Sequence, residues 1–292
     1  MKILYVTGAK RPDYLNDLVF HGLYSLFGND VVDSCCLEYM YRQYTPPRKQ
    51  KKLYGRGFTV YATIERDDID RSDLQRKIEQ RHFDLVIYGS VHRCVDYLEA
   101  VLAAYPRNRI VLLDGEDAAY TASSFFGRFP VFKRELVEKR EGLFPISFSI
   151  PKEKIAASPA PKDKRFGTCI PGQKKTYVFK TEADYYRDYQ RSHYGITLKK
   201  GGWDCLRHYE ILANHCLPYF EALEQCPPET LANFPKGLCL EARALADAEK
   251  SGAAFDDARY GELLEAAMQH LDAHLTTEAV ARYMVDTLKA LE

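Results

Sequence analysis

The sequence predicts an α/β fold of two layered lobes, of which the second is smaller and ends in a helical tail. Short apolar runs that end at glycine or polar residues alternate with stretches of helical periodicity, which is the order of a doubly wound parallel sheet. This order occurs twice, on either side of a proline-rich segment at 150–175. A length of 292 residues suits two domains of ordinary size. We therefore expect a first domain at 1–150 and a second at 151–292.

The first lobe opens with a buried strand at 2–8, an apolar run that ends at glycine. Residues 13–27 follow with apolar side chains at helical spacing, and Gly28 is placed to be the C-cap. Prolines and basic residues at 41–57 predict a long exposed loop. Further strands are expected at 30–33, 58–64, 83–90 and 109–117, and helices at 70–81 and 94–104. These elements complete one α/β layer by about residue 125.

The second lobe repeats the pattern with fewer strands. The segment at 150–175 predicts a linker with little core of its own. Strands are expected at 177–179, 194–198 and 215–220, and helices at 184–191, 206–214 and through most of 240–292. The second α/β layer is therefore expected to be smaller than the first.

Composition and charge exclude several classes of protein. The chain is 46% apolar, which is too much for a disordered protein. Its 41 Lys+Arg balance 41 Asp+Glu, so it lacks the basic excess of proteins that bind nucleic acid through the phosphates. No stretch approaches the roughly 20 apolar residues of a membrane-spanning helix, and the N-terminal run is too short for a signal peptide. The 8 cysteines lack CxxC and zinc spacings and are expected to be reduced. We expect a cytoplasmic protein, in which the basic loop at 48–56 either contacts anionic lipid peripherally or is simply solvated.

Carboxylates gather at the end of one predicted strand, where Asp114, Glu116 and Asp117 stand close together. Ligands of open α/β sheets bind beyond the carboxyl ends of the strands, and crowding raises the pKa of a carboxyl group toward the range of a general base. A solvated loop is the alternative. His92 follows the strand at 83–90 and is either a second catalytic group or a structural hydrogen-bonding residue. The absence of GxGxxG after the first strand and of a P-loop motif excludes classical dehydrogenases and P-loop enzymes.

A turn rich in lysine and glycine leads from strand to helix within the segment 195–220, at Lys199, Lys200, Gly201 and Gly202. Backbone N–H groups at a helix start, the helix dipole and two ammonium groups could together hold a pyrophosphate. The paired glycines would permit a close approach of the backbone to such a ligand. An exposed basic turn is the alternative.

Arg207 and Glu210 share one face of the helix that follows the turn. Arg207 could reach the phosphates of a nucleotide and Glu210 could accept hydrogen bonds from ribose hydroxyls, or the two could form an intrahelical ion pair. Tyrosines crowd the start of the second half, where their rings could stack on a sugar or nucleobase or pack between the lobes: Tyr177, Tyr185, Tyr186, Tyr189 and Tyr194.

The same helix and the strand after it resemble the R-x-Y-E-x-L-A-x-G-C-x-P-V/Y segment of the C-terminal domain of two-Rossmann (GT-B) glycosyltransferases, including the exostosin-like and CgeB-like groups. The matching residues are Arg207, Tyr209, Glu210, Leu212, Ala213, Cys216, Pro218 and Tyr219. His215 stands where that family has glycine. Residues 131–136 and 144–151 also resemble the domain crossover of CgeB-like members. The resemblance implies a nucleotide-sugar donor in the second domain, with Glu210 at the ribose and Lys199, Lys200 and Arg207 near the diphosphate.

A glycosyltransferase of polysaccharide biosynthesis is therefore the expected function, with a glycan or other hydroxyl acceptor bound to the first lobe near the acidic strand end. The resemblance implies that no metal is needed, and the acidic residues are too scattered for a magnesium site. Lysine and arginine would therefore neutralise the leaving group, and no cofactor beyond the nucleotide sugar is expected. Two alternatives stay open, namely a non-catalytic two-lobe binding protein and a nucleotide-sugar hydrolase or epimerase. No nucleic-acid partner is expected, and the sequence does not predict the oligomeric state.

Overall fold

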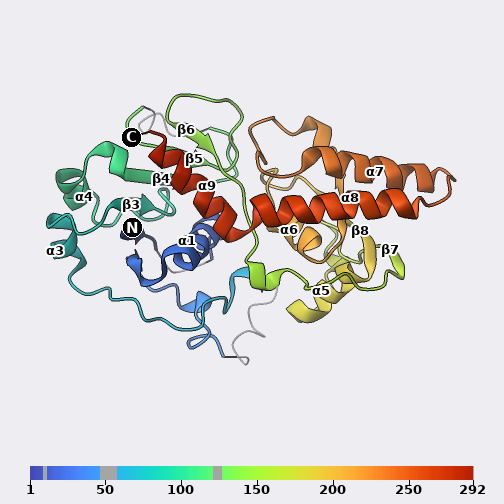
Figure 1. The fold of residues 1–292 in the computed structure, drawn as a ribbon, viewed down its shortest axis with the longest axis horizontal. Coiled ribbons are helices and arrows are strands. Elements are labelled where there is room, and N and C mark those ends of the chain that lie inside the picture. The colour runs from blue at the N-terminus through green and yellow to red at the C-terminus, as the bar shows by residue number, and fades with distance from the viewer. Residues whose placement is uncertain (9–11, 47–57, 121–126, 292) are drawn as a thin grey trace.

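A computed structural model describes residues 1–8, 12–46, 58–120 and 127–291. The chain forms two lobes, each built on a parallel sheet with helices around it (Figure 1). The predicted α/β fold of two lobes with a helical C-terminal tail is confirmed. The basic loop at 48–56, for which a lipid contact was considered, lies outside the described residues.

The first lobe holds a sheet of 6 parallel strands in the order β2-β1-β3-β4-β5-β6. Its strands are β1 Ile3–Val6, β2 Val31–Asp33, β3 Leu85–Tyr88, β4 Ile110–Asp114, β5 Val131–Lys133 and β6 Leu143–Pro145. The four strands at 3–6, 31–33, 85–88 and 110–114 are buried at every residue, which explains why they read as unbroken apolar runs. The strand order reverses between β1 and β3, so a crevice opens beyond their carboxyl ends.

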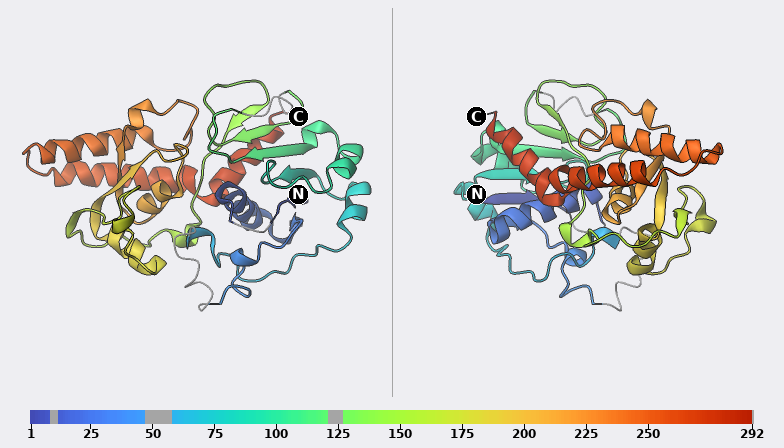
Figure 2. Two further views of the ribbon diagram at one scale, coloured as in Figure 1. Left: turned by 180° about the vertical axis from the view of Figure 1, so that it is seen from behind. Right: turned by 45° about the vertical axis from the view of Figure 1, so that its right-hand side comes forward.

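Helices cover both faces of the first sheet. They are α1 Tyr14–Phe27, α3 Leu74–Glu79 and α4 Leu98–Ala104, joined by the C-terminal helix α9 Thr277–Lys289. Helix α9 packs along α1, although the sequence assigned it to the second domain (Figures 1 and 2). Gly22 makes this contact possible, because a Cβ at that position would lie 2.0 Å from the carbonyl oxygen of Thr277.

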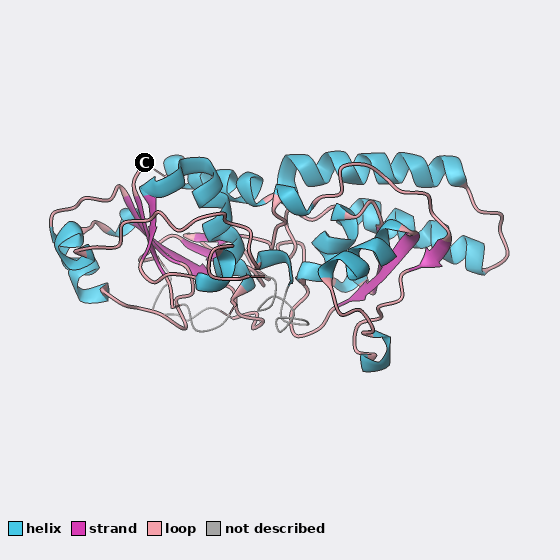
Figure 3. Cartoon of the chain, turned by 90° about the horizontal axis from the view of Figure 1, so that it is seen from below, coloured by secondary structure: helices cyan, strands magenta, loops and turns pink. Residues whose placement is uncertain are grey.

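The second lobe holds a sheet of 3 parallel strands in the order β7-β8-β9, which is smaller than the first sheet, as the sequence predicts. Its elements are β7 Lys164–Phe166, α5 Glu182–Gln190, β8 Ser192–Leu198, α6 Leu206–Ala213, β9 Leu217–Glu221, α7 Lys236–Lys250 and α8 Asp257–His270. The two sheets lie apart, one in each half of the molecule (Figure 3).

The chain crosses between the lobes twice at neighbouring places. It leaves the first lobe near Ile150 and returns through a short π-helical turn, Leu271–Leu275. The two crossings meet in an isolated parallel bridge between Ile150 and Thr276. His21 on α1 binds both, with Nδ1 at 2.9 Å from Thr277 Oγ1 and Nε2 at 3.1 Å from a Glu153 carboxylate oxygen.

Three local predictions differ from the structure. Residues 58–64 form no strand, because the chain turns in a short 3₁₀ helix, Phe58–Val60, and only Ile64 pairs, in an isolated bridge. Residues 177–179 are not in a strand either. The third strand of the second sheet is instead β7, inside the predicted linker. It is a polar edge strand whose Lys164 is paired with Asp188, so it lacks the apolar pattern of a buried strand.

No helix among the described residues is both long and apolar enough to cross a membrane.

Candidate functional site

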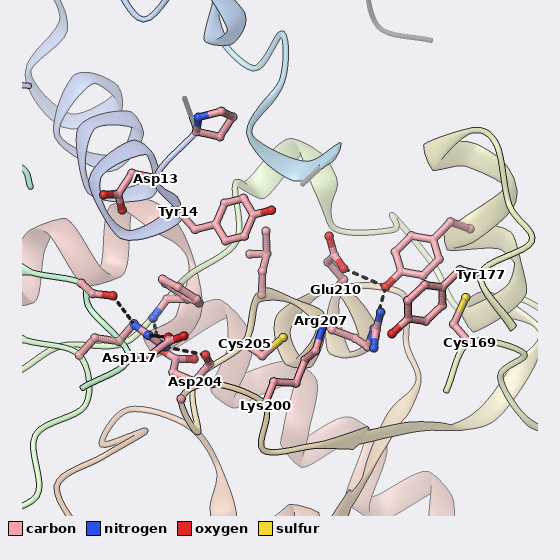
Figure 4. A pocket seen from close by; sticks show the side chains of 18 of the residues that line it. Asp13, Tyr14, Asp117, Cys169, Tyr177, Lys200, Asp204, Cys205, Arg207 and Glu210 are labelled. Atoms are coloured by element: carbon pink, nitrogen blue, oxygen red, sulfur yellow. Dashed lines mark hydrogen bonds and ion pairs between the residues drawn. The ribbon is translucent and has the colours of Figure 1, made fainter. Parts of the chain in front are cut away.

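A cleft of about 620 Å³ opens between the two lobes, next to the carboxyl ends of the first sheet (Figure 4). The first lobe and the segment after it contribute Pro12, Asp13, Tyr14, Arg93, Gly115, Asp117, Arg134 and Phe148. The second lobe contributes Cys169, Tyr177, Tyr185, Lys200, Gly201, Gly202, Asp204, Cys205, Leu206, Arg207 and Glu210. Most residues of the predicted donor site therefore face a cavity shared with the first lobe.

The predicted catalytic residues near the end of β4 have different surroundings. Asp114 is buried at the end of β4, where it lies 3.1 Å from Lys133 Nζ and 3.3 Å from His92 Nε2. Glu116 is exposed and pairs with Arg93 at 3.1 Å. Neither of these carboxylates lines the cleft, and His92 does not line it either. A direct role as base for Asp114, Glu116 or His92 thus lacks the contact with the cleft that it requires.

Asp117 is the one member of the predicted acidic set that lines the cleft. Its Oδ1 accepts a hydrogen bond from Arg134, whose side chain is 2% exposed. Arg134 also donates to the carbonyl oxygens of Gly115 at 3.0 Å and Asp204 at 2.6 Å, and its guanidinium lies over the Phe148 ring. Arg134 therefore ties the acidic strand end to the second lobe.

The glycine turn of the second lobe packs directly on the first lobe. A Cβ on Gly201 would lie 2.1 Å from Asp117 Oδ2, and one on Gly202 would lie 2.4 Å from Glu135 Oε1. The two carboxylate oxygens of Glu135 accept hydrogen bonds from the backbone N–H groups of Trp203 and Asp204, each at 2.9 Å. The glycines thus permit the lobes to meet, and these two N–H groups are not available to a diphosphate.

Asp204 belongs to the same contact between the lobes. Its Oδ2 accepts from the backbone N–H of Phe148 at 2.6 Å, and its Oδ1 accepts from the Tyr209 hydroxyl at 2.9 Å. Burial raises the pKa of this carboxyl group to about 7. Asp204 and Glu135 are both missing from the predicted site, because nothing in their local sequence shows that they meet across the lobes.

Arg207 and Lys200 are two cations that line the cleft from the second lobe. Arg207 Nε donates to the Tyr185 hydroxyl at 3.4 Å, and the guanidinium lies 5.3 Å from the centre of the Tyr177 ring. Arg207 Nη1 is buried and has no hydrogen-bond partner in the described part of the chain. Neither cation forms an ion pair with a described carboxylate. Lys199 lies outside the cleft, where its ammonium group packs over Trp203.

Glu210 lines the cleft but is only 6% exposed. Its Oε1 accepts from Thr59 Oγ1 at 2.6 Å and its Oε2 accepts from the Tyr185 hydroxyl at 2.9 Å. Burial raises the pKa of its carboxyl group, although the two hydroxyl donors act in the opposite direction. Arg207 and Glu210 do not form the ion pair that was the alternative, because no guanidinium nitrogen of Arg207 lies within 4.0 Å of a carboxylate oxygen of Glu210.

Asp13 faces the cleft from the start of α1 and was not among the predicted catalytic residues. Its Oδ2 accepts from Ser90 Oγ at 2.7 Å and pairs with Arg93 at 3.0 Å. Its Oδ1 takes no hydrogen bond from a described residue. The sequence signal that could have identified Asp13 is its place just beyond β1, at the point where the strand order reverses.

No group of three or more His, Cys, Asp or Glu side chains among the described residues is arranged to hold a metal ion.

Comparisons with known proteins find similarity among solved structures alone. No protein-family model and no curated protein matches the sequence. The chain is similar to Anabaena Alr3699/HepE in complex with UDP and glucose, with a TM-score of 0.49 and 10% identity over 99% of this chain and 100% of that chain. The complex of HepE with UDP-glucose gives a TM-score of 0.48 at 9% identity with the same coverage. MurG of Acinetobacter baumannii gives 0.42 at 11% identity, also over 99% and 100% of the two chains.

Proposed function

We propose that the protein is a glycosyltransferase that moves a sugar from a nucleotide-sugar donor to a hydroxyl group of a glycan or another acceptor. The observation that carries the proposal is Arg207, whose guanidinium lines the cleft with a buried nitrogen that lacks a partner among the described residues. A buried N–H group that lacks an acceptor is costly unless a ligand supplies one. Carboxylates of the first lobe line the same cleft, so an anion site and a base are close together.

The donor would bind along the second lobe. Arg207 presents a planar fork of donors that suits a phosphate group, and Lys200 adds a second positive charge at the cleft. Tyr177 offers an aromatic face beside Arg207. Glu210 would accept hydrogen bonds from the ribose hydroxyls. Figure 4 places Lys200, Arg207, Tyr177 and Glu210 along one side of the cleft.

The base would be a carboxylate of the first lobe, and the geometry favours Asp13 over Asp117. Asp13 has one oxygen held by Ser90 and Arg93, whereas the other takes no hydrogen bond from the residues that the structure describes and can accept a proton. Asp117 is bound to Arg134 through one oxygen and lies against Gly201 with the other. The acceptor hydroxyl would therefore be oriented by Asp13.

The reaction follows from these positions. The acceptor oxygen forms a bond to the anomeric carbon while its proton passes to the carboxylate of Asp13. The bond between the anomeric carbon and the phosphate oxygen breaks, and its electron pair leaves with the nucleoside diphosphate. Lys200 and Arg207 neutralise the charge that develops on this leaving group. The proposed transfer needs no metal ion, and loss of activity in EDTA would overturn this part of the proposal.

The donor site is tested with Arg207→Ala and the control Arg187→Ala, which removes an exposed arginine on α5. We expect Arg207→Ala to weaken the binding of UDP, GDP or ADP at least about tenfold in titration calorimetry, because a bond between charged groups is lost. The control should bind as the wild type does. Equal affinity of Arg207→Ala and wild type would remove the donor-site assignment.

The base is tested with Asp13→Asn and the control Glu116→Gln, which lies outside the cleft. We expect turnover of Asp13→Asn to fall by about 10² to 10⁴, the usual contribution of a general base, with nucleotide affinity unchanged. Near-normal turnover of this variant would exclude Asp13 as the base. Release of sugar from the donor without any acceptor would indicate the hydrolase alternative instead.

The presence of Asp13 in the same cleft as Arg207 and Lys200 favours catalysis over simple binding of a ligand. A binding protein does not need a carboxylate base facing an anion site, whereas a transferase must hold its two substrates against each other.

A further inference from the structure

Thr59 of the first lobe closes over Glu210 of the second lobe. Its side chain is 0% exposed, and its hydroxyl donates to Glu210 Oε1. The other carboxylate oxygen is taken by the Tyr185 hydroxyl. Glu210 is therefore almost completely covered, although it lines the cleft. Because Glu210 is so nearly covered, a ligand that is to bind both of its oxygens gains the space to do so when one of these two hydroxyl groups moves away.

We propose that Thr59 is a displaceable substitute for one ribose hydroxyl of the donor and that it lowers the donor affinity of the empty protein. The inference rests on the proposed donor site. Two hydroxyl groups, one on each oxygen of Glu210, are the arrangement that a vicinal diol makes with a carboxylate. In the empty site, the hydroxyl groups of Thr59 and Tyr185 thus occupy the positions that the two ribose hydroxyls would take.

Thr59 is the hydroxyl group that leaves, because it comes from the other lobe, whereas Tyr185, which binds the other oxygen of Glu210, belongs to the same lobe as Glu210. The Tyr185 hydroxyl is bound by Tyr189 at 3.2 Å and by Arg207 Nε at 3.4 Å in addition to Glu210. Among the described residues, Thr59 has a second partner in the Tyr186 hydroxyl at 3.0 Å. It can keep that bond after it leaves Glu210, so its displacement need not leave a buried hydroxyl group unsatisfied.

The exchange couples the donor to the contact between the lobes. When a ribose hydroxyl replaces Thr59, one direct hydrogen bond between the two lobes is lost at this edge of the cleft. The contacts of Arg134 and Glu135 with the glycine turn lie elsewhere in the interface and are unaffected. Donor binding would thus leave the segment Phe58–Val60 bound to the second lobe through Tyr186 alone among the hydroxyl contacts of Thr59 with described residues, while the lobes stay joined.

The experiment compares wild type with Thr59→Val, which keeps the branched shape and removes the hydroxyl, and with Thr59→Ser, which keeps the hydroxyl. Thr45→Val is the matched control, because Thr45 is another buried threonine of the first lobe whose hydroxyl donates to a backbone carbonyl. Binding is measured by titration calorimetry with the tightest of UDP, GDP and ADP and with its 2′,3′-dideoxy analogue. Thermal unfolding verifies that each variant is folded.

We expect Thr59→Val to bind the nucleoside diphosphate on the order of tenfold more tightly, because the ligand no longer competes with a hydrogen bond to a charged acceptor. Thr59→Ser and Thr45→Val should bind as the wild type does, and the dideoxy analogue should show no gain. Unchanged or weaker binding by Thr59→Val, or an equal gain for the dideoxy analogue, overturns the inference. Binding that depends on Arg207 but not on Thr59 leaves the proposed function standing, whereas no nucleotide binding by any variant overturns both.

Discussion

Replacement of Glu135 by alanine should destabilise the protein more than any other single carboxylate deletion near the cleft. Glu135 is 4% exposed and accepts hydrogen bonds from the backbone N–H groups of Trp203 and Asp204 and from Arg134 Nη1, each at 2.9 Å. The substitution leaves two buried N–H groups without an acceptor and removes one carboxylate from a buried guanidinium. Breaking a buried charged pair costs about 3–5 kcal/mol. Arg134 keeps Asp117 and two carbonyl oxygens, so we expect a loss of about 3 kcal/mol in the free energy of unfolding.

Urea unfolding followed by circular dichroism measures this loss. Glu135→Gln keeps the shape and one oxygen and should lie between wild type and alanine. The matched control is Glu138→Ala, three positions along the chain, whose side chain is 73% exposed and paired at the surface with Arg140. We expect this control to change stability by less than about 0.5 kcal/mol. A loss below about 1 kcal/mol for Glu135→Ala, or a loss equal to that of the control, would refute the assigned role of Glu135 at the interface between the lobes.

Two further predictions concern stability. Gly22→Ala should cost at least about 2 kcal/mol in urea unfolding, because its Cβ would meet the Thr277 carbonyl oxygen and force α1 and α9 apart. Gly261→Ala, in open space on α8, should instead stabilise by about 0.5–1 kcal/mol, and equal effects at the two glycines would contradict the packing argument. Burial raises the pKa of the Asp17 carboxyl group to about 8 and that of Asp204 to about 7, so the folded state holds protons that the unfolded state releases above about pH 4. The free energy of unfolding should therefore fall as the pH rises toward 7 and 8, by up to about 1.4 kcal/mol per pH unit for each group. Urea titrations in buffers between pH 5 and pH 8, the range that these pKa values set, measure this change. A free energy of unfolding that stays constant or rises over this range would contradict the prediction.

Prediction from sequence succeeded where the signal is local. Strands β1, β3 and β4 are buried on both faces, so their apolar runs are visible without any knowledge of their neighbours. It failed at β7, because an edge strand that binds one neighbour can be polar, and at 58–64, where apolar residues fill the core through a turn. The packing of α9 on α1 was equally invisible, since it joins residues more than 250 positions apart.

The residues proposed to bind the donor are close together in the sequence, so their proximity in space could be predicted from it. Lys200, Arg207 and Glu210 lie within one turn and one helix, and local geometry brings them to the same end of that helix. The composition of the lysine and glycine turn also marked the place where backbone must approach closely, although the structure shows that the approach is to Glu135 and Asp117.

Only the tertiary structure decided which carboxylates reach the cleft. Asp114 is paired in register with Lys133 of the neighbouring strand, and that pairing buries it at the end of the sheet. Asp13 reaches the cleft because the strand order reverses beside β1. Thr59 reaches Glu210 because the two lobes close on each other. Each of these contacts joins residues that are distant in the chain, and no spacing within a short segment can encode them.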